Sequence, residues 1–240
     1  MEENNENKTR SNFADEIENL YRLHYITKKH DHIIELKRGE WRLFEPSKFI
    51  YAYFAFNSFY NFDWNESLKR NELIGFPKII KEGKKGEEVK EEASEGQKYK
   101  SMIDFIFEHA QDSDKDDFFK IVCRNKRNED LIKTISKITT DNRIKQSERN
   151  DFIKEFEKLI TTKEIIVGKL KNDIVRFIYL VRNNIFHGTK NTIEMSENFQ
   201  RKRLEIYTNI LVALNQILFN ILERETDFQP QKTYIFSSRF

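Results

Sequence analysis

The stretch 204-LEIYTNILVALNQILFNIL-222 repeats apolar side chains at steps of three and four residues over several helical turns. This spacing returns side chains to one face of an α-helix, and a face of this length needs partner helices to cover it. We therefore predict a long helix within a helical bundle. It should begin after Ser196, a good N-cap residue, with Glu197 in its first turn. The predicted buried face is formed by Leu204, Tyr207, Ile210, Leu211, Leu214, Ile217, Leu218, Ile221 and Leu222.

The composition agrees with a largely helical chain. Among 240 residues there are only 7 Gly and 3 Pro, too few for the many tight turns of an all-β protein. Hydrophobic residues make up 38% of the chain and charged residues 34%, but 21 Phe and 9 Tyr supply enough large side chains for a core. We predict an all-α fold, a helical bundle of about six to seven helices.

A second apolar segment, 41-WRLFEPSKFIYAYFAFNSFYNFDWN-65, is predicted to form a central, buried helix. Pro46 with Ser47 suits its first turn, although the aromatic density leaves a β-strand as an alternative. Helical periodicity also marks 12–36, where Phe13, Ile17 and Leu20 recur at steps of four and three residues. Further helices are expected over 98–111, 115–138, 148–160 and 163–187.

The polar and low-complexity segments predict which parts of the chain are tails, folded domain and loop. Residues 1–11 are polar and predict a disordered tail, and 229–240 a C-terminal tail. The stretch 81-KEGKKGEEVKEEASEGQK-98 has one large aliphatic residue, Val89, so it cannot bury enough surface to offset its ordering entropy. We predict a single domain over 12–228 with 81–98 as a charged mobile loop inserted in it.

Charge and cysteine content restrict the setting of the protein. The 42 basic and 40 acidic residues give a net charge of +2, so any contact with nucleic acid must come from a local patch. A single cysteine, Cys123, excludes an internal disulfide and favours a reducing compartment. The first residues lack a signal-peptide pattern, and we find no apolar run of membrane-spanning length without polar amides. We expect a cytoplasmic protein with no membrane partner.

The stretch 176-RFIYLVRNNIFHGTK-190 places Arg182, Asn183, Asn184 and His187 at the end of an apolar helix. A buried arginine is costly, so Arg182 must have a partner or face a cleft. Asn183 and His187 are four residues apart and share a helix face, whereas Arg182 and His187 lie about 140° apart around the helix. Beside a two-fold mate, two Arg and two His would line one shared groove.

The segment 182-RNNIFHG-188 resembles the signature of the HEPN superfamily, in which four to six residues, the first of them polar, separate an Arg from a His. The position at the end of an apolar helix, before a turn and a final long helix, is similar as well. The resemblance implies one HEPN-like helical domain in a homodimer. It also implies an endoribonuclease, often metal-independent, of toxin–antitoxin, abortive-infection, CRISPR or other phage-defence systems.

The same resemblance implies roles for individual residues. His187 would be the general base or acid, Arg182 would hold the scissile phosphate, and Asn183 would orient His187 or the phosphate. Thr189 stands where one subgroup has a Tyr that is modified by a partner nucleotidyltransferase, which argues against that regulation. Partners would be RNA and a second copy, with a cognate antitoxin or regulatory protein as a further one. The alternative is a catalytically inactive helical module that binds RNA, a nucleotide or a protein.

Other residues are assigned supporting roles. The basic run Arg201, Lys202 and Arg203 is a candidate RNA-binding patch, with a solvated helix face as the alternative. Asn184, Asn57 and Tyr60 are candidates for contacts behind the Arg182 site, with a mutual hydrogen bond of Asn57 and Tyr60 as the alternative. Structural alternatives remain for the motif itself, because Arg182 could pair with Asp173 or Glu194, and His187 could be a cation favoured by the helix C-terminus.

We predict no metal and no cofactor. In 112-DSDKDDFFK-120 the alternate Asp residues begin like a calcium loop, but Asp117 stands where Gly is required and Cys123 where Glu is required. That stretch is instead predicted to be an acidic helix N-terminus. His24, His30 and His32 lack the spacing of a metal site and are predicted to lie on the surface.

Overall fold

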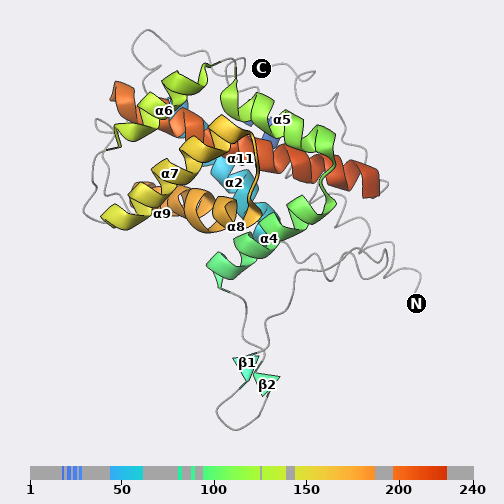
Figure 1. Ribbon diagram of the computed structural model, residues 1–240. Helices are drawn as coiled ribbons and strands as arrows, with labels where there is room; N and C mark the ends of the chain where they lie inside the picture. Colours follow the sequence, from blue (N-terminus) through green and yellow to red (C-terminus); the bar gives the residue numbers. More distant parts are fainter. Residues whose placement is uncertain are drawn as a thin grey trace, which may run out of the picture.

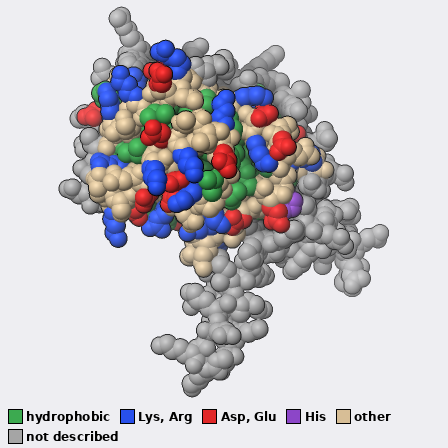
Figure 2. Space-filling view, viewed as in Figure 1, with side chains coloured by type: hydrophobic (Ala, Val, Ile, Leu, Met, Phe, Trp, Pro, Cys, Tyr) green, Lys and Arg blue, Asp and Glu red, His purple; other side chains and the backbone are tan. Residues whose placement is uncertain are grey.

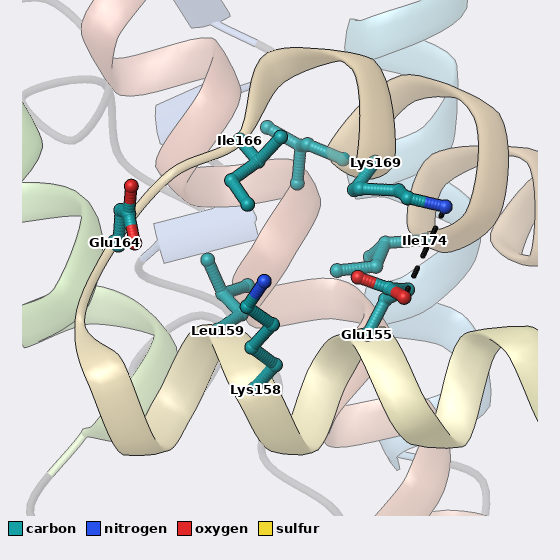
Figure 3. Close-up of a pocket in the computed structure, with 8 residues that line it drawn as sticks. Glu155, Lys158, Leu159, Glu164, Ile166, Lys169 and Ile174 are labelled. Atoms are coloured by element: carbon teal, nitrogen blue, oxygen red, sulfur yellow. Dashed lines mark ion pairs between the residues drawn. The ribbon is translucent and has the colours of Figure 1, made fainter.

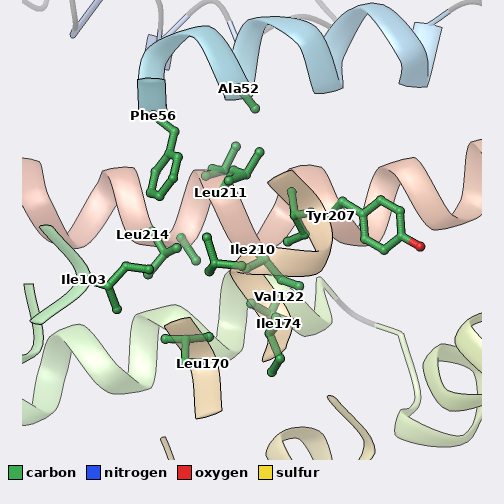
Figure 4. Close-up of a cluster of buried hydrophobic side chains, with 14 of the residues drawn as sticks. Ala52, Phe56, Ile103, Val122, Leu170, Ile174, Tyr207, Ile210, Leu211 and Leu214 are labelled. Carbon is green, nitrogen blue, oxygen red and sulfur yellow. The ribbon is translucent and has the colours of Figure 1, made fainter. Parts of the chain in front are cut away.

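The computed structural model is an all-α helical bundle, as predicted (Figure 1). It describes residues 18, 21–22, 24–25, 27–28, 44–61, 81–82, 88–89, 94–124, 126–138, 144–186 and 197–225. The long helix α11 (Asn198–Glu225) crosses the bundle, and α2 (Phe44–Asn61) packs along it. Figure 4 shows α2 on one side of α11, with buried side chains of other helices on the opposite side.

Helix α11 confirms the predicted apolar face, whose nine side chains are all buried. The predicted N-cap Ser196 lies outside the described residues, and the helix begins at Asn198, with the Glu197 carbonyl accepting from the Arg201 amide at 3.0 Å. By length and composition alone, Asn198–Arg224 would also pass as a membrane span, but 83% of its most apolar window is buried in the bundle. Its role as the central core helix accounts for that composition.

Helix α2 resolves the ambiguity of the aromatic segment in favour of a helix. Pro46 lies in its first turn, as expected for a residue without an amide hydrogen. Side chains around most of its circumference are buried, which agrees with its predicted central position. The buried residues are Phe49, Ala52, Tyr53, Ala55, Phe56, Phe59 and Tyr60.

The predicted helix over 115–138 is wrong as one element. It is two helices, α5 (Asp112–Cys123) and α6 (Asn128–Ser136). Arg124 ends α5 in the left-handed region, with φ of 35° and its amide donating to the Lys120 carbonyl at 3.0 Å. This closure is the usual end of a helix, made here by a residue that carries a side chain.

The N-terminus of α5 has the acidic capping predicted for 112–120. Asp114 accepts the Gln111 amide at 2.9 Å, and its buried carboxylate also binds Asn220 and Arg224 of α11. The aspartates therefore serve the fold, by capping α5 and joining it to the central helix.

The predicted helix over 148–160 is confirmed as α7 (Gln146–Thr162). The one predicted over 163–187 is instead divided into α8 (Val167–Lys169), the π-helical segment η2 (Leu170–Val175) and α9 (Arg176–Phe186). Lys163, with φ of 53°, closes α7 before this run begins. Single-turn π segments inside helices are frequent at functional sites.

The charged insert has more structure than predicted. Two short strands, β1 (Lys81–Glu82) and β2 (Glu88–Val89), pair antiparallel, and they lie away from the bundle in Figure 1. Helix α4 (Glu95–His109) begins inside the predicted loop, with Ser94 and Gln97 forming a capping box. The prediction that residues 95–98 belong to a loop was therefore wrong.

The N-terminal segment is described at a few positions only. Within the helix expected over 12–36, residues 18, 21–22, 24–25 and 27–28 are helical. The prediction that His24 lies on the surface was wrong, since its ring is buried against Phe219, with centroids 5.2 Å apart. The tails 1–11 and 229–240, with His30 and His32, lie outside the described residues.

Candidate functional site

Arg182 lies in the last turns of α9, with its side chain 23% exposed at the edge of the core. Its guanidinium carbon is 4.9 Å from the ring centroid of Tyr53 and 5.9 Å from that of Tyr179. A guanidinium near aromatic faces gains about 0.5–2 kcal/mol, and more as water is excluded. The tyrosines thus offset part of the cost of placing this charge in an apolar helix.

Polar partners also hold the Arg182 side chain. Its Nη1 donates to Oδ1 of Asn183 at 2.8 Å, so these two predicted site residues are brought together. The same Nη1 is 3.8 Å from Oε1 of Glu95, an ion pair too long to be a hydrogen bond. Among the described residues, Arg182 therefore has the acidic partner Glu95, which the sequence did not suggest. Asp173 pairs instead with Lys169 at 3.2 Å, and Glu194 lies outside the described residues.

Glu95 is the centre of this cluster. As the first residue of α4 it lies at a helix N-terminus, where a carboxylate is favoured. Oε1 accepts from the Tyr60 hydroxyl at 2.7 Å, and Oε2 accepts from the Tyr179 hydroxyl at 2.8 Å. One side chain thereby joins α2, α4 and α9 beside Arg182.

Tyr60 and Asn57 continue the cluster along α2. The Tyr60 hydroxyl is 2.5 Å from Asn57 Oδ1 and 3.0 Å from the Tyr53 hydroxyl. Because a hydroxyl has one proton and the carboxylate is the strongest acceptor nearby, Tyr60 donates to Glu95 and Tyr53 donates to Tyr60. Asn57 and Tyr60 were expected either to reach the Arg182 site or to bond to each other. They contact each other, and Tyr60 also contacts Glu95 and Tyr53 beside Arg182.

The tyrosine hydroxyls of this cluster are all donors at neutral pH. Burial raises the pKa of Tyr53, Tyr60 and Tyr179 above the ordinary value, and it raises the pKa of Tyr99 to about 12. For Tyr179, a hydrogen bond with Asn183 acts in the opposite direction and is outweighed. We refer to Tyr53, Tyr60, Glu95, Tyr179, Arg182 and Asn183 as the Arg182 cluster.

The other motif residues have different placements. Asn184 is buried, with about the same low exposure as the core residues around it on α9. His187, Gly188 and Thr189 lie outside the described residues, directly after the end of α9 at Phe186. The predicted catalytic contribution of His187 therefore stays a prediction based on the sequence.

Two of the three residues of the basic run on α11 are held by contacts within the fold, and RNA binding by this run stays a prediction. Arg201 makes a two-pronged salt bridge with Glu45, at 2.7 and 2.8 Å, and its side chain is 12% exposed. Arg203 is 7% exposed and donates to the Lys137 carbonyl at the end of α6. Lys202 is the one member of the run that is exposed.

Elsewhere the described surface shows no second site with comparable chemistry. On the face seen in Figure 2, basic and acidic side chains are interspersed. A shallow pocket between α7 and the α8–η2 run holds Lys169, 3.9 Å from Glu155 (Figure 3). Among the described residues no cluster of three or more His, Cys, Asp or Glu could hold a metal ion. The pocket lining is Glu155, Lys158, Leu159, Glu164, Ile166, Lys169, Leu170 and Ile174.

Comparisons with protein families, with curated proteins and with solved structures found no match to this chain. The Arg182 cluster and the 182–188 motif are therefore the features from which a function can be proposed.

Sequence reasoning missed three members of the cluster, and two of them had a readable signal. Tyr179 precedes Arg182 by three residues, which places both on one helix face. Tyr53 precedes Tyr60 by seven residues, again on one face. Glu95 is 87 positions from Arg182, inside a run of similar acidic residues, and had no such signal. The capping pattern 94-SEGQ-97 did mark the start of its helix.

Proposed function

We propose that this protein is a metal-independent endoribonuclease of the HEPN type, with Arg182 and His187 as its catalytic residues. The observation that carries the proposal is the state of Arg182. A partly exposed guanidinium is held between aromatic rings and an asparagine at the end of the apolar helix that leads into His187. A phosphate could approach a cation that is fixed in this way with little loss of side-chain entropy.

In the proposed reaction the ribose 2′-oxygen attacks the adjacent phosphorus and gives its proton to a base. The bond from phosphorus to the 5′-oxygen breaks, and that oxygen takes up a proton. The products carry a 2′,3′-cyclic phosphate and a 5′-hydroxyl. His187 moves the protons, and Arg182 holds the phosphate oxygens and stabilises the charge that builds on them. Since the nucleophile belongs to the RNA, this route needs no metal-bound water.

A homodimer is part of the proposal, because helix spacing separates Arg182 and His187 of one chain by about 140°, so each catalytic pair would form between copies, Arg182 of one with His187 of the other. Two copies related by a two-fold axis next to α9 would bring two His187 and two Arg182 side chains to one groove. Such a groove would be a composite active site. By resemblance to the same superfamily, the role would be that of a toxin or phage-defence effector in the cytoplasm, restrained by an antitoxin or a regulatory protein.

A specific observation favours a second candidate, a catalytically inactive helical module that binds RNA, a nucleotide or a protein. The Glu95 carboxylate lies 3.8 Å from the Arg182 guanidinium and would repel a phosphate bound there. A purely structural ion pair would also consist of an arginine neutralised by a fixed acid. We rank this candidate second because the ion pair is long and Arg182 keeps partial exposure.

Cleavage of an end-labelled structured RNA in excess EDTA tests the proposal. We expect the parent to produce 2′,3′-cyclic phosphate ends, and both His187→Ala and Arg182→Ala to lose cleavage by at least about 100-fold. His109→Ala and Arg176→Ala are the matched controls, since His109 bonds a backbone carbonyl and Arg176 pairs with Glu148. RNA binding without cleavage by the parent would identify the binding module instead.

Mixing the two inactive variants tests the composite site. If each site takes Arg182 from one protomer and His187 from the other, a mixed dimer of Arg182→Ala and His187→Ala regains one complete site. We expect up to about a quarter of parental activity from a statistical mixture of protomers. No recovery with freely exchanging dimers would place both residues of a site in the same protomer.

A further inference from the structure

We propose that Glu95 is a positioning residue of the Arg182 site, holding the tyrosines that fix the guanidinium. This inference rests on the proposed function for its catalytic consequence, and on the described contacts for its geometry. Glu95 belongs to α4 and is remote in sequence from the 182–188 motif.

The two oxygens of Glu95 accept hydrogen bonds from different tyrosines. Oε1 receives the Tyr60 hydroxyl at 2.7 Å, and Oε2 receives the Tyr179 hydroxyl at 2.8 Å. Tyr60 in turn lies 3.0 Å from the Tyr53 hydroxyl. The carboxylate thus holds Tyr179 directly and Tyr53 through one intermediate hydroxyl.

Tyr53 and Tyr179 are the two rings that flank Arg182. Their centroids lie 4.9 Å and 5.9 Å from the guanidinium carbon. Since Glu95 determines the orientation of both rings, it determines where the guanidinium rests. The separation of 3.8 Å between Oε1 and Nη1 means that Glu95 attracts the guanidinium without occupying one of its hydrogen bonds.

The same contacts argue against Glu95 as the base that takes the 2′-proton. A base must be within hydrogen-bonding reach of the substrate, with its acceptor atom directed at the proton that it takes. Both oxygens of Glu95 already accept from tyrosine hydroxyls that burial keeps protonated. Its effect on the reaction is therefore expected through Arg182.

The test compares Glu95→Gln and Glu95→Ala with Asp104→Asn, a control on the same helix. Asp104 is also paired, with Lys171 at 2.5 Å, but it does not belong to the Arg182 cluster. We expect Glu95→Gln to lower kcat about 10- to 100-fold with KM within about 3-fold, as a misplaced catalytic group does. Glu95→Ala, which removes both acceptors, should lose more, and Asp104→Asn should match the parent.

A second measurement separates this inference from the proposed function. The ¹H–¹⁵N resonance of Arg182 Nε reports the surroundings of the guanidinium with no RNA present, and Arg182→Lys assigns the peak. A changed shift in Glu95→Gln, unchanged in Asp104→Asn, supports positioning even if the parent cleaves no RNA. Unchanged kinetics, or an unchanged Arg182 resonance in Glu95→Gln, would overturn the role of Glu95 while leaving the nuclease proposal to its own test.

Discussion

Replacing Asp114 by Asn tests how the bundle is held together, because this carboxylate joins α5 to α11. Asp114 is almost fully buried and accepts the Gln111 amide at 2.9 Å and the Asn220 side chain at 2.8 Å. The Nη2 of Arg224 completes its coordination at 2.9 Å. The substitution keeps the shape of the side chain, removes its charge and turns one acceptor into a donor.

The expected loss of stability depends on the burial of Asp114 and on how far water can replace its interaction with Arg224. Removing one member of a buried ion pair costs about 3–5 kcal/mol, because the other charge remains buried. The Arg224 side chain is 28% exposed, so water can replace part of the lost interaction. We therefore expect a loss of about 2–3 kcal/mol, which for a chain of this size lowers Tm by about 5–10 °C.

Urea unfolding followed by circular dichroism provides the measurement, with Asp112→Asn as the control. Asp112 is on the same helix and pairs with Lys115 at 2.9 Å, but its side chain is 98% exposed, so its loss should stay within about 0.5 kcal/mol. We expect Asp114→Asn to lower the midpoint by about 1 M with an unchanged slope. Equal midpoints for the two variants would refute the reasoning.

The pH dependence of the difference adds a second check. Burial would raise the pKa of Asp114, but hydrogen bonds from Arg224, Asn220 and Gln111 outweigh it and hold the pKa below its usual range. The folded pKa thus lies below the unfolded one of about 3.9, so the contribution is present above that pH and is lost as pH falls through the folded value. The gap between parent and Asp114→Asn should therefore shrink below about pH 4.

Three further predictions concern other parts of the chain. Arg203→Leu should destabilise the bundle by about 1–3 kcal/mol by removing the donor to the Lys137 carbonyl, as thermal unfolding would show. Lys202→Ala should leave stability within about 0.5 kcal/mol and, in filter binding, reduce the salt dependence of RNA affinity by at most about one ion. Burial, together with the charge of Lys28, lowers the pKa of His24 to about 3, so the folded state keeps the imidazole neutral. Unfolding therefore takes up a proton below about pH 6.5. As the pH falls from about 6.5 to about 3, the free energy of unfolding should fall by up to about 1.4 kcal/mol per pH unit. His24→Phe should remove this pH dependence in acid titrations.

The elements that could be predicted from the sequence are those with a regular local pattern. The face of α11 repeats over several turns, and each of its nine predicted side chains is buried. The positions where a helix ends or changes its hydrogen bonding could not be predicted in the same way. Arg124 closes α5 in a conformation that glycine usually adopts, so no residue type marks that position. The π-helical segment η2 has the apolar spacing of an ordinary helix and differs only in its hydrogen bonds.

The candidate site could be predicted only in part, for the same reason. Arg182 and Asn183 are adjacent in sequence and meet as expected. The acidic partner described for Arg182, Glu95, comes from another helix, and the nearby Asp173 that the sequence suggested is paired with Lys169. For the basic run, the position of a residue around the helix predicts its burial better than its residue type does. Arg203 precedes Tyr207 by four residues and lies on the buried face of α11 with it.

Arg182, Arg201 and Arg203 differ in how the fold holds them. Arg203 donates to a backbone carbonyl and is 7% exposed, and Arg201 forms a close bidentate pair with Glu45. Both are arranged to satisfy neighbouring groups of the fold. Arg182 is more exposed, at 23%, and its acid stays at 3.8 Å, while rings and an amide hold its position. The fixed placement and partial exposure of Arg182 are therefore our reasons for proposing it as the phosphate-binding residue.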